Sequence, residues 1–210
     1  MPDPTQRPLT RTHLLAIIRL AGRKKQPNLD LSRKGITELP DEIGNLTDLR
    51  SLSLNDNRLT ALPESIGKLT KLQWLDLVCN QLTVLPESIG QLTKLESLNL
   101  SHNQLTILPE SIGQLTHHMY LYLGYNRLRE LPDSIGNLAN LRLLDLRGNR
   151  LSTLPPSLSQ MTQLQELKLI NNPLDPALKC VRTRATRATR VPPQSGESRA
   201  TLRSETRPRW

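Results

Sequence analysis

Aromatic residues are scarce in this sequence of 210 residues. It has no phenylalanine, and its aromatic side chains are two tryptophans and three tyrosines. Aromatic side chains normally provide much of the apolar burial of a core. Their scarcity excludes a core of ordinary mixed composition, and leucine must supply most of the buried surface instead.

Cysteines and long hydrophobic runs are also few. Cys79 and Cys180 lie far apart without a C-x-x-C motif, which excludes a disulfide framework or a zinc site and favours a reducing compartment. The apolar stretch from Leu14 to Leu20 is short and is interrupted by Arg19, so it fails as a signal peptide or a membrane span. We therefore expect a cytoplasmic protein without a membrane segment.

The net charge of +9 is concentrated at the two ends of the chain. Residues 1–28 carry +5 and residues 179–210 carry +7, which leaves −3 for the residues between them. The body therefore has no field that would attract a phosphate backbone. Nucleic-acid binding would depend on the basic tail alone, and we do not expect it of the body.

Catalytic and metal-binding motifs are missing as well. The sequence has no G-x-x-x-x-G-K-[ST] loop, and no Ser/His/Asp set recurs outside the repeats described below. His117 and His118 form the only histidine pair and lack further ligands. We expect no enzyme activity, no metal and no cofactor. His118 stands in a slot that Leu72 and Leu95 fill in other repeats, which predicts a neutral, partly buried histidine that weakens its repeat.

The sequence does contain one repeated unit. An asparagine recurs every 23 residues, at Asn57, Asn80, Asn103, Asn126, Asn149 and Asn172. A partial copy precedes these six, in which Leu29, Leu31 and Ile36 keep the pattern and Lys34 stands in the place of asparagine. The chain is therefore one unit copied along a line.

Each part of the repeat has a physical role. The alternation Leu75-Asp76-Leu77 predicts a short half-buried strand. The asparagine that follows can pair backbone groups left inside the turn. The Leu-Pro-Glu-Ser-Ile-Gly segment predicts a brief 3₁₀ or helical turn that begins at proline and stops at glycine.

A single repeat would not fold alone. It buries about seven aliphatic side chains at roughly 1.5–3 kcal/mol each, whereas ordering its backbone costs about 1–2 kcal/mol per residue. Stacking on both neighbours reverses this balance, so the array must be one cooperative domain with capped ends.

The pattern L-x-x-L-x-L-x-x-N-x-L followed by L-P-x-x-I-G resembles the leucine-rich-repeat family in its 23-residue intracellular form. It is also similar to the repeat arrays of bacterial Roco proteins and of plant intracellular Ras-group-related proteins. The resemblance covers residues 27–174. It implies an α/β right-handed solenoid, or horseshoe, with a parallel β-sheet on the concave face and 3₁₀ or short helical turns on the convex face.

We divide the chain into three parts. Residues 1–26 form an N-terminal capping helix region, because Leu14, Ile17, Ile18 and Ala21 have helical spacing. Residues 27–174 hold the repeats. Residues 175–210 form a basic tail whose composition predicts disorder. The alternative for the first part is a basic helix on a membrane surface.

Function should lie where the copies differ, at the outward positions of the strands. Trp74, Tyr120, Tyr122 and Tyr125 all fall there. The candidate partner-binding residues are Trp74, Asp76, Val78, His102, Tyr120, Tyr122, Tyr125, Leu143, Asp145 and Arg147. An alternative is that these residues only extend the sheet surface, because tyrosine and tryptophan are good strand formers.

We expect a monomeric protein-interaction scaffold that binds a protein partner through the concave face. The alternative is a regulatory or recognition module of a Roco-like signalling protein whose catalytic domain is absent from this chain. A third hypothesis, binding of nucleic acid or of an acidic surface by the arginine-rich tail, depends on charge alone.

Overall fold

The computed structural model describes residues 9–175. These residues form one α-helix, seven strands and six 3₁₀ turns, and the 3₁₀ turns alternate with the strands. In chain order the elements are α1 Arg11–Arg23, β1 Asn28–Asp30, η1 Asp41–Asn45, β2 Ser51–Ser53, η2 Glu64–Lys68, β3 Trp74–Asp76, η3 Glu87–Gln91, β4 Ser97–Asn99, η4 Glu110–Gln114, β5 Tyr120–Tyr122, η5 Asp133–Asn137, β6 Leu143–Asp145, η6 Pro156–Gln160 and β7 Glu166–Lys168.

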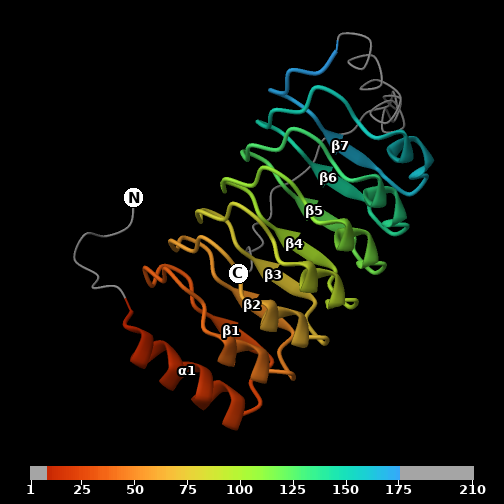
Figure 1. Cartoon of the computed structure of the whole chain (residues 1–210). Helices are drawn as coiled ribbons and strands as arrows, with labels where there is room; N and C mark the ends of the chain where they lie inside the picture. Colours follow the sequence, from red (N-terminus) through yellow and green to blue (C-terminus); the bar gives the residue numbers. More distant parts are fainter. Residues whose placement is uncertain (1–8, 176–210) are drawn as a thin grey trace, which may run out of the picture.

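The strands form a single parallel sheet in which each strand pairs with the next one in the sequence, from β1 to β7. The register places Ser51 beside Trp74, Trp74 beside Ser97 and Ser97 beside Tyr120. Every strand partner is thus 23 residues away. Figure 1 shows the strands following one another along the length of the array, with α1 at the end next to β1. The predicted solenoid with a parallel sheet and 3₁₀ turns is confirmed.

Helix α1 covers the first coil of the array. Its N-cap is Thr10, whose side chain accepts a hydrogen bond from the His13 backbone N–H at 3.3 Å. Leu14, Ile18 and Ala21 are buried against the repeats, as their helical spacing requires. These three side chains lie on successive turns of α1, and they shield the core from water at the N-terminal end of the array.

The 3₁₀ turns begin as predicted and end differently. A proline precedes each of them as N-cap, and an acidic residue opens η1 to η5. The glycine is not a stop, because η3 continues to Gln91, one residue beyond Gly90. A Cβ on Gly90 would lie 2.5 Å from the Ser111 carbonyl oxygen of the next coil. Glycine is required here because neighbouring turns pack too closely for any side chain.

Leucine and isoleucine fill the space between the sheet and the 3₁₀ turns, and most of them are fully buried. His118 replaces one leucine of this core. Its imidazole has no solvent exposure, so it is fully buried rather than partly buried as predicted. Its Nδ1 lies 3.1 Å from the Leu95 carbonyl oxygen, and its Nε2 has no hydrogen-bond partner. Burial lowers the pKa of His118 from 6.5 to about 4, and the Leu95 and Tyr120 backbone groups oppose this shift only in part.

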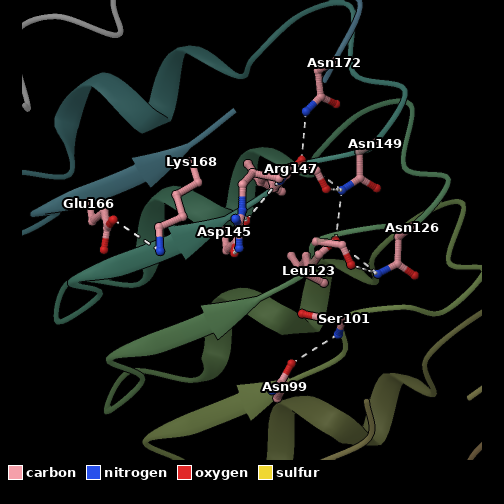
Figure 2. Close-up of polar contacts among 12 residues, drawn as sticks. Asn99, Ser101, Leu123, Asn126, Asp145, Arg147, Asn149, Glu166, Lys168 and Asn172 are labelled. Atoms are coloured by element: carbon pink, nitrogen blue, oxygen red, sulfur yellow. Dashed lines mark hydrogen bonds and ion pairs between the residues drawn. The ribbon is translucent and has the colours of Figure 1, made fainter. Parts of the chain in front are cut away.

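The repeated asparagines join each coil to the one before it. Asn103 donates from Nδ2 to the Leu77 oxygen of the preceding coil at 2.9 Å and to the Leu100 oxygen of its own coil at 3.0 Å. Its Oδ1 accepts from the Leu82 N–H at 3.0 Å. Asn126, Asn149 and Asn172 make the same bond to the preceding coil. Figure 2 shows Asn149 donating to the Leu123 oxygen of that coil. One side chain thus satisfies buried backbone groups of two coils.

The last described coil is less well covered than the others. The apolar residues that are only partly buried in this coil are Leu154, Leu158, Met161, Leu164 and Leu167. Ser159 stands where the earlier repeats have the close-packing glycine, and its Oγ donates to the Pro156 oxygen at 2.7 Å. The basic tail predicted for residues 175–210 lies outside the described residues apart from Asp175.

Candidate functional site: the outward face of the sheet

The strands direct their middle residue into the core and their first and third residues outward. The first residues of β3, β4, β5 and β6 are Trp74, Ser97, Tyr120 and Leu143, which lie side by side in the register. We call the surface formed by the first and third residues of β1–β7 the strand face. Because the fold determines only the middle residue, the strand face is free to vary between repeats.

Three aromatic side chains lie on the strand face. Trp74 is 47% exposed, and Tyr120 and Tyr122 are partly buried. Strand β4 separates Trp74 from the two tyrosines and contributes only Ser97 and Asn99 there. Two strand spacings of about 4.8 Å put Trp74 roughly 10 Å from Tyr120. Two aromatic groups thus flank a polar strip with smaller side chains.

Both aspartates among the partner-binding candidates have a structural role. Oδ1 of Asp76 accepts from the Val78 N–H at 3.2 Å, and Oδ1 of Asp145 accepts from the Arg147 N–H at 3.1 Å. Asn99 does the same with the Ser101 N–H. A side-chain acceptor that bonds the amide two residues ahead forms an Asx turn. These residues therefore end their strands.

Asp145 corrects the sequence prediction most clearly, because it is only 3% exposed. Its carboxylate is covered by Arg147, which bonds it with Nε at 3.0 Å and with Nη2 at 2.7 Å (Figure 2). The hydrogen bond and charge of Asp145 raise the pKa of Arg147. A partner would contact the partly exposed guanidinium of Arg147 rather than the carboxylate.

His102 and Tyr125 lie beyond the strands, not on the strand face. Both occur in turns with a left-handed backbone, at φ 57° and 58°. Their rings stack with centroids 4.5 Å apart and an angle of 13° between the planes. A Cβ at Gly148 would lie 2.8 Å from the Tyr125 ring, so the glycine of the next coil makes room for it. The structure thus places this pair in a separate patch beyond the C-terminal ends of β4 and β5.

Val78 and Leu143, the remaining candidates, are both partly buried. Leu143 lies beside Tyr120 in the register and extends the aromatic surface. Val78 follows Asp76 at the end of β3. The structure therefore brings Tyr120, Tyr122 and Leu143 together, with Trp74 nearby.

Sequence reasoning missed a basic groove next to Trp74. The groove has a volume of about 610 Å³ and lies at the N-terminal ends of β1 to β3. Its lining residues are Lys25, Pro27, Asn28, Asp48, Arg50, Lys71, Gln73 and Trp74. The signal available in the sequence was that Arg50 directly precedes the outward position of β2.

Among residues 9–175, no group of three or more histidine, cysteine or acidic side chains is arranged to hold a metal ion. None of the helices formed by these residues has the length and apolar character that a membrane crossing needs. Cys79 is a free cysteine that is exposed as a whole residue. Partial burial of its thiol and the charge of Asp56 raise the pKa of the thiol. Its thiol is therefore less readily ionised than an ordinary cysteine.

Parallel strands stacked coil upon coil, with an asparagine bridge in each coil, define a solenoid repeat protein that offers one extended strand face. The leucine-rich repeat region family matches residues 27–110, 64–128 and 108–177. The chain therefore belongs to the leucine-rich repeat family. None of the curated proteins compared with it is similar enough in sequence to count as a relative.

Several solved structures share the fold. A TDR receptor is 31% identical with a TM-score of 0.67, and 73% of this chain aligns with 28% of that protein. An internalin from Listeria monocytogenes is 28% identical with a TM-score of 0.62, covering 70% of this chain and 41% of the internalin. The PEPR1–AtPEP1 structure is 36% identical with a TM-score of 0.61, covering 66% and 20%. The chain thus spans less than half the length of each of these proteins.

Proposed function

We propose that this chain is a protein-interaction scaffold whose partner binds the strand face. The observation that carries the proposal is the exposure of Trp74, 47%, beside the cluster of Tyr120, Tyr122 and Leu143. A tryptophan held outward by a rigid sheet loses little conformational freedom on binding, and tryptophan and tyrosine are enriched at the centres of protein interfaces. Repeat solenoids commonly bind through such extended surfaces.

The rest of the strand face supports a protein as the partner. The charged residues at the first and third strand positions are Asp30, Asp76, Asp145, Glu166 and Lys168, so acidic side chains predominate on the strand face. An acidic, partly apolar surface suits a folded or extended polypeptide better than a uniform polyanion. Membership of the repeat family favours a binding role over a catalytic one.

The test compares two double variants as bait in a pull-down from host extract, with the unchanged chain as reference. Trp74→Ala/Tyr120→Ala should lose the partner, because each truncation removes about 2 kcal/mol or more of binding free energy at an interface centre. Glu87→Ala/Gln91→Ala, at exposed positions of η3, should retain it. Ser88 is unsuitable for this control because it is buried.

Recovered partners are then measured by titration with the purified variants. If the Glu87→Ala/Gln91→Ala bait loses the partner and the aromatic variant keeps it, the partner binds the side of the 3₁₀ turns and the proposal is wrong. A role as a recognition module of a larger, Roco-like signalling protein would use the same strand face, and it predicts that the recovered partner regulates a catalytic domain.

A further inference from the structure

Two cations in the basic groove make no ion pair and no side-chain hydrogen bond within the described part of the chain. Lys71 is paired there, because its Nζ lies 2.6 Å from Oδ1 of Asp48. Lys25 and Arg50 make no ion pair and no side-chain hydrogen bond within residues 9–175. Lys71 and Lys25 both lower the pKa of Asp48, so these two lysines share one carboxylate. With Arg50, the groove keeps an excess of positive charge beside an exposed indole.

The position of Lys25 is determined by the end of α1. The Gln26 N–H bonds the Ala21 oxygen at 3.0 Å, and the Lys25 N–H bonds the Gly22 oxygen at 3.1 Å. This is a Schellman motif, and it holds Lys25 at φ 48°, where glycine is usual. A lysine in a left-handed conformation is less stable there than glycine. Its side chain nevertheless lines the groove, which is consistent with a role in binding.

The other groove residues are attached to the rigid sheet. Arg50 directly precedes β2, and its backbone N–H bonds the Pro27 oxygen at 2.6 Å. Trp74 opens β3, with its N–H bonded to the Arg50 oxygen at 3.0 Å. Hydrogen-bonded backbone thus determines where the three residues lie, and a ligand has only to order the exposed side chains of Lys25 and Arg50.

The positive charge of the groove does not continue onto the neighbouring part of the sheet. Asp76 is two residues from Trp74 on β3, and Glu96 accepts a hydrogen bond from Gln73 of the groove lining at 3.3 Å. A nucleic-acid backbone leaving the groove toward the sheet would meet these carboxylates and be repelled. One or two acidic side chains with an apolar neighbour fit the charges, and Trp74 can cover the apolar neighbour.

We propose that this groove binds an acidic side chain of a protein segment, with Lys25 and Arg50 holding the carboxylate and Trp74 packing against an adjacent apolar residue of that segment. The proposal rests on the proposed function, because it names the chemistry of a partner that also contacts the strand face. It adds a charge requirement that the aromatic surface alone does not impose.

The experiment selects a displayed library of random linear peptides against the full chain. The strongest binder is synthesised together with a version in which each Asp or Glu is replaced by Asn or Gln. Affinities are measured by fluorescence anisotropy for the unchanged chain, for Lys25→Glu/Arg50→Glu, and for Arg58→Glu/Arg127→Glu as a control with the same charge change. Arg58 and Arg127 are exposed and lie beyond the C-terminal ends of the strands.

We expect acidic residues next to apolar ones in the selected peptides. The acidic peptide should bind the unchanged chain about tenfold tighter than its amide version, which corresponds to about 1.4 kcal/mol. The difference should disappear in Lys25→Glu/Arg50→Glu and persist in the control variant. The neutral variant Lys25→Gln/Arg50→Gln should give an intermediate result, which separates lost attraction from a damaged fold.

Equal binding of the acidic and amide peptides would overturn the groove proposal, as would a difference that survives Lys25→Glu/Arg50→Glu. If selected peptides lack acidic residues but lose affinity for Tyr120→Ala/Tyr122→Ala, the groove proposal is wrong and strand-face binding stands. If no peptide binds the unchanged chain, the groove proposal is wrong, and strand-face binding is judged by the pull-down with the Trp74→Ala/Tyr120→Ala variant. Loss of binding to a labelled single-stranded oligonucleotide in Lys25→Glu/Arg50→Glu, but not in the control, would show that the groove takes phosphate instead.

Discussion

Replacing Asn103 by alanine tests what holds neighbouring coils together. The substitution removes the donor to the Leu77 and Leu100 oxygens and the acceptor of the Leu82 N–H. Each of these hydrogen bonds contributes about 0.5–1.5 kcal/mol net, and a buried group left unpaired costs about 1–3 kcal/mol. Asn103 is only 7% exposed, so water can replace few of the lost bonds. We expect Asn103→Ala to lower the free energy of unfolding by about 2–4 kcal/mol.

The matched control is Asn137→Ala, which makes the same chemical change at an exposed position of η5 without a side-chain hydrogen bond. Its effect should stay within about 0.5 kcal/mol. Asn172→Ala should cost less than Asn103→Ala, because Asn172 is only partly buried in the last coil. Urea unfolding followed by circular dichroism measures all three.

A loss for Asn103→Ala no larger than that for Asn137→Ala would refute the reasoning. It would mean that the packed leucines alone hold neighbouring coils together. It would also mean that water replaces the hydrogen-bond partners of the Asn103 amide without a loss of stability. A changed m-value would show separately that the array no longer unfolds as one unit, which is a known behaviour of repeat proteins.

Three further substitutions test the packing of the core. Gly90→Ala should destabilise the array by about 1–3 kcal/mol, because its Cβ would lie 2.5 Å from the Ser111 oxygen, whereas Gly124→Ala, whose nearest contact is 3.4 Å, should cost clearly less in the same thermal melt. The folded-state pKa of His118 is about 4 and the unfolded value is 6.5, so the unfolded chain binds a proton at higher pH than the folded chain does. The stabilisation that depends on neutral His118 is therefore complete above pH 6.5, and it is lost as the pH falls toward 4. The loss should reach about 3 kcal/mol, and His118→Leu should remove this part of the pH dependence of unfolding; an unchanged pH profile in that variant would contradict the assignment.

The repeat, the strand positions and the linear array could all be predicted from the amino-acid sequence. Spacing of 23 residues and alternation at Leu75-Asp76-Leu77 are enough to predict that Trp74, Ser97 and Tyr120 share a column, because strands of a regular repeat pair in a constant register. The capping helix followed from the spacing of Leu14 and Ile18 in the same way. Periodicity determines which residues are equivalent, and equivalent residues share a face.

The contacts between atoms of neighbouring coils could not be predicted in this way, because they depend on the three-dimensional packing. Gly90 read as a helix stop in the sequence, yet it is needed because the Ser111 oxygen approaches it. Asp145 read as exposed, yet Arg147 covers it. The groove joins Lys25, at the end of a helix outside the repeats, with side chains of the array. A repeat pattern carries no information on such contacts, because they depend on the distance between coils and on the direction in which the capping helix ends.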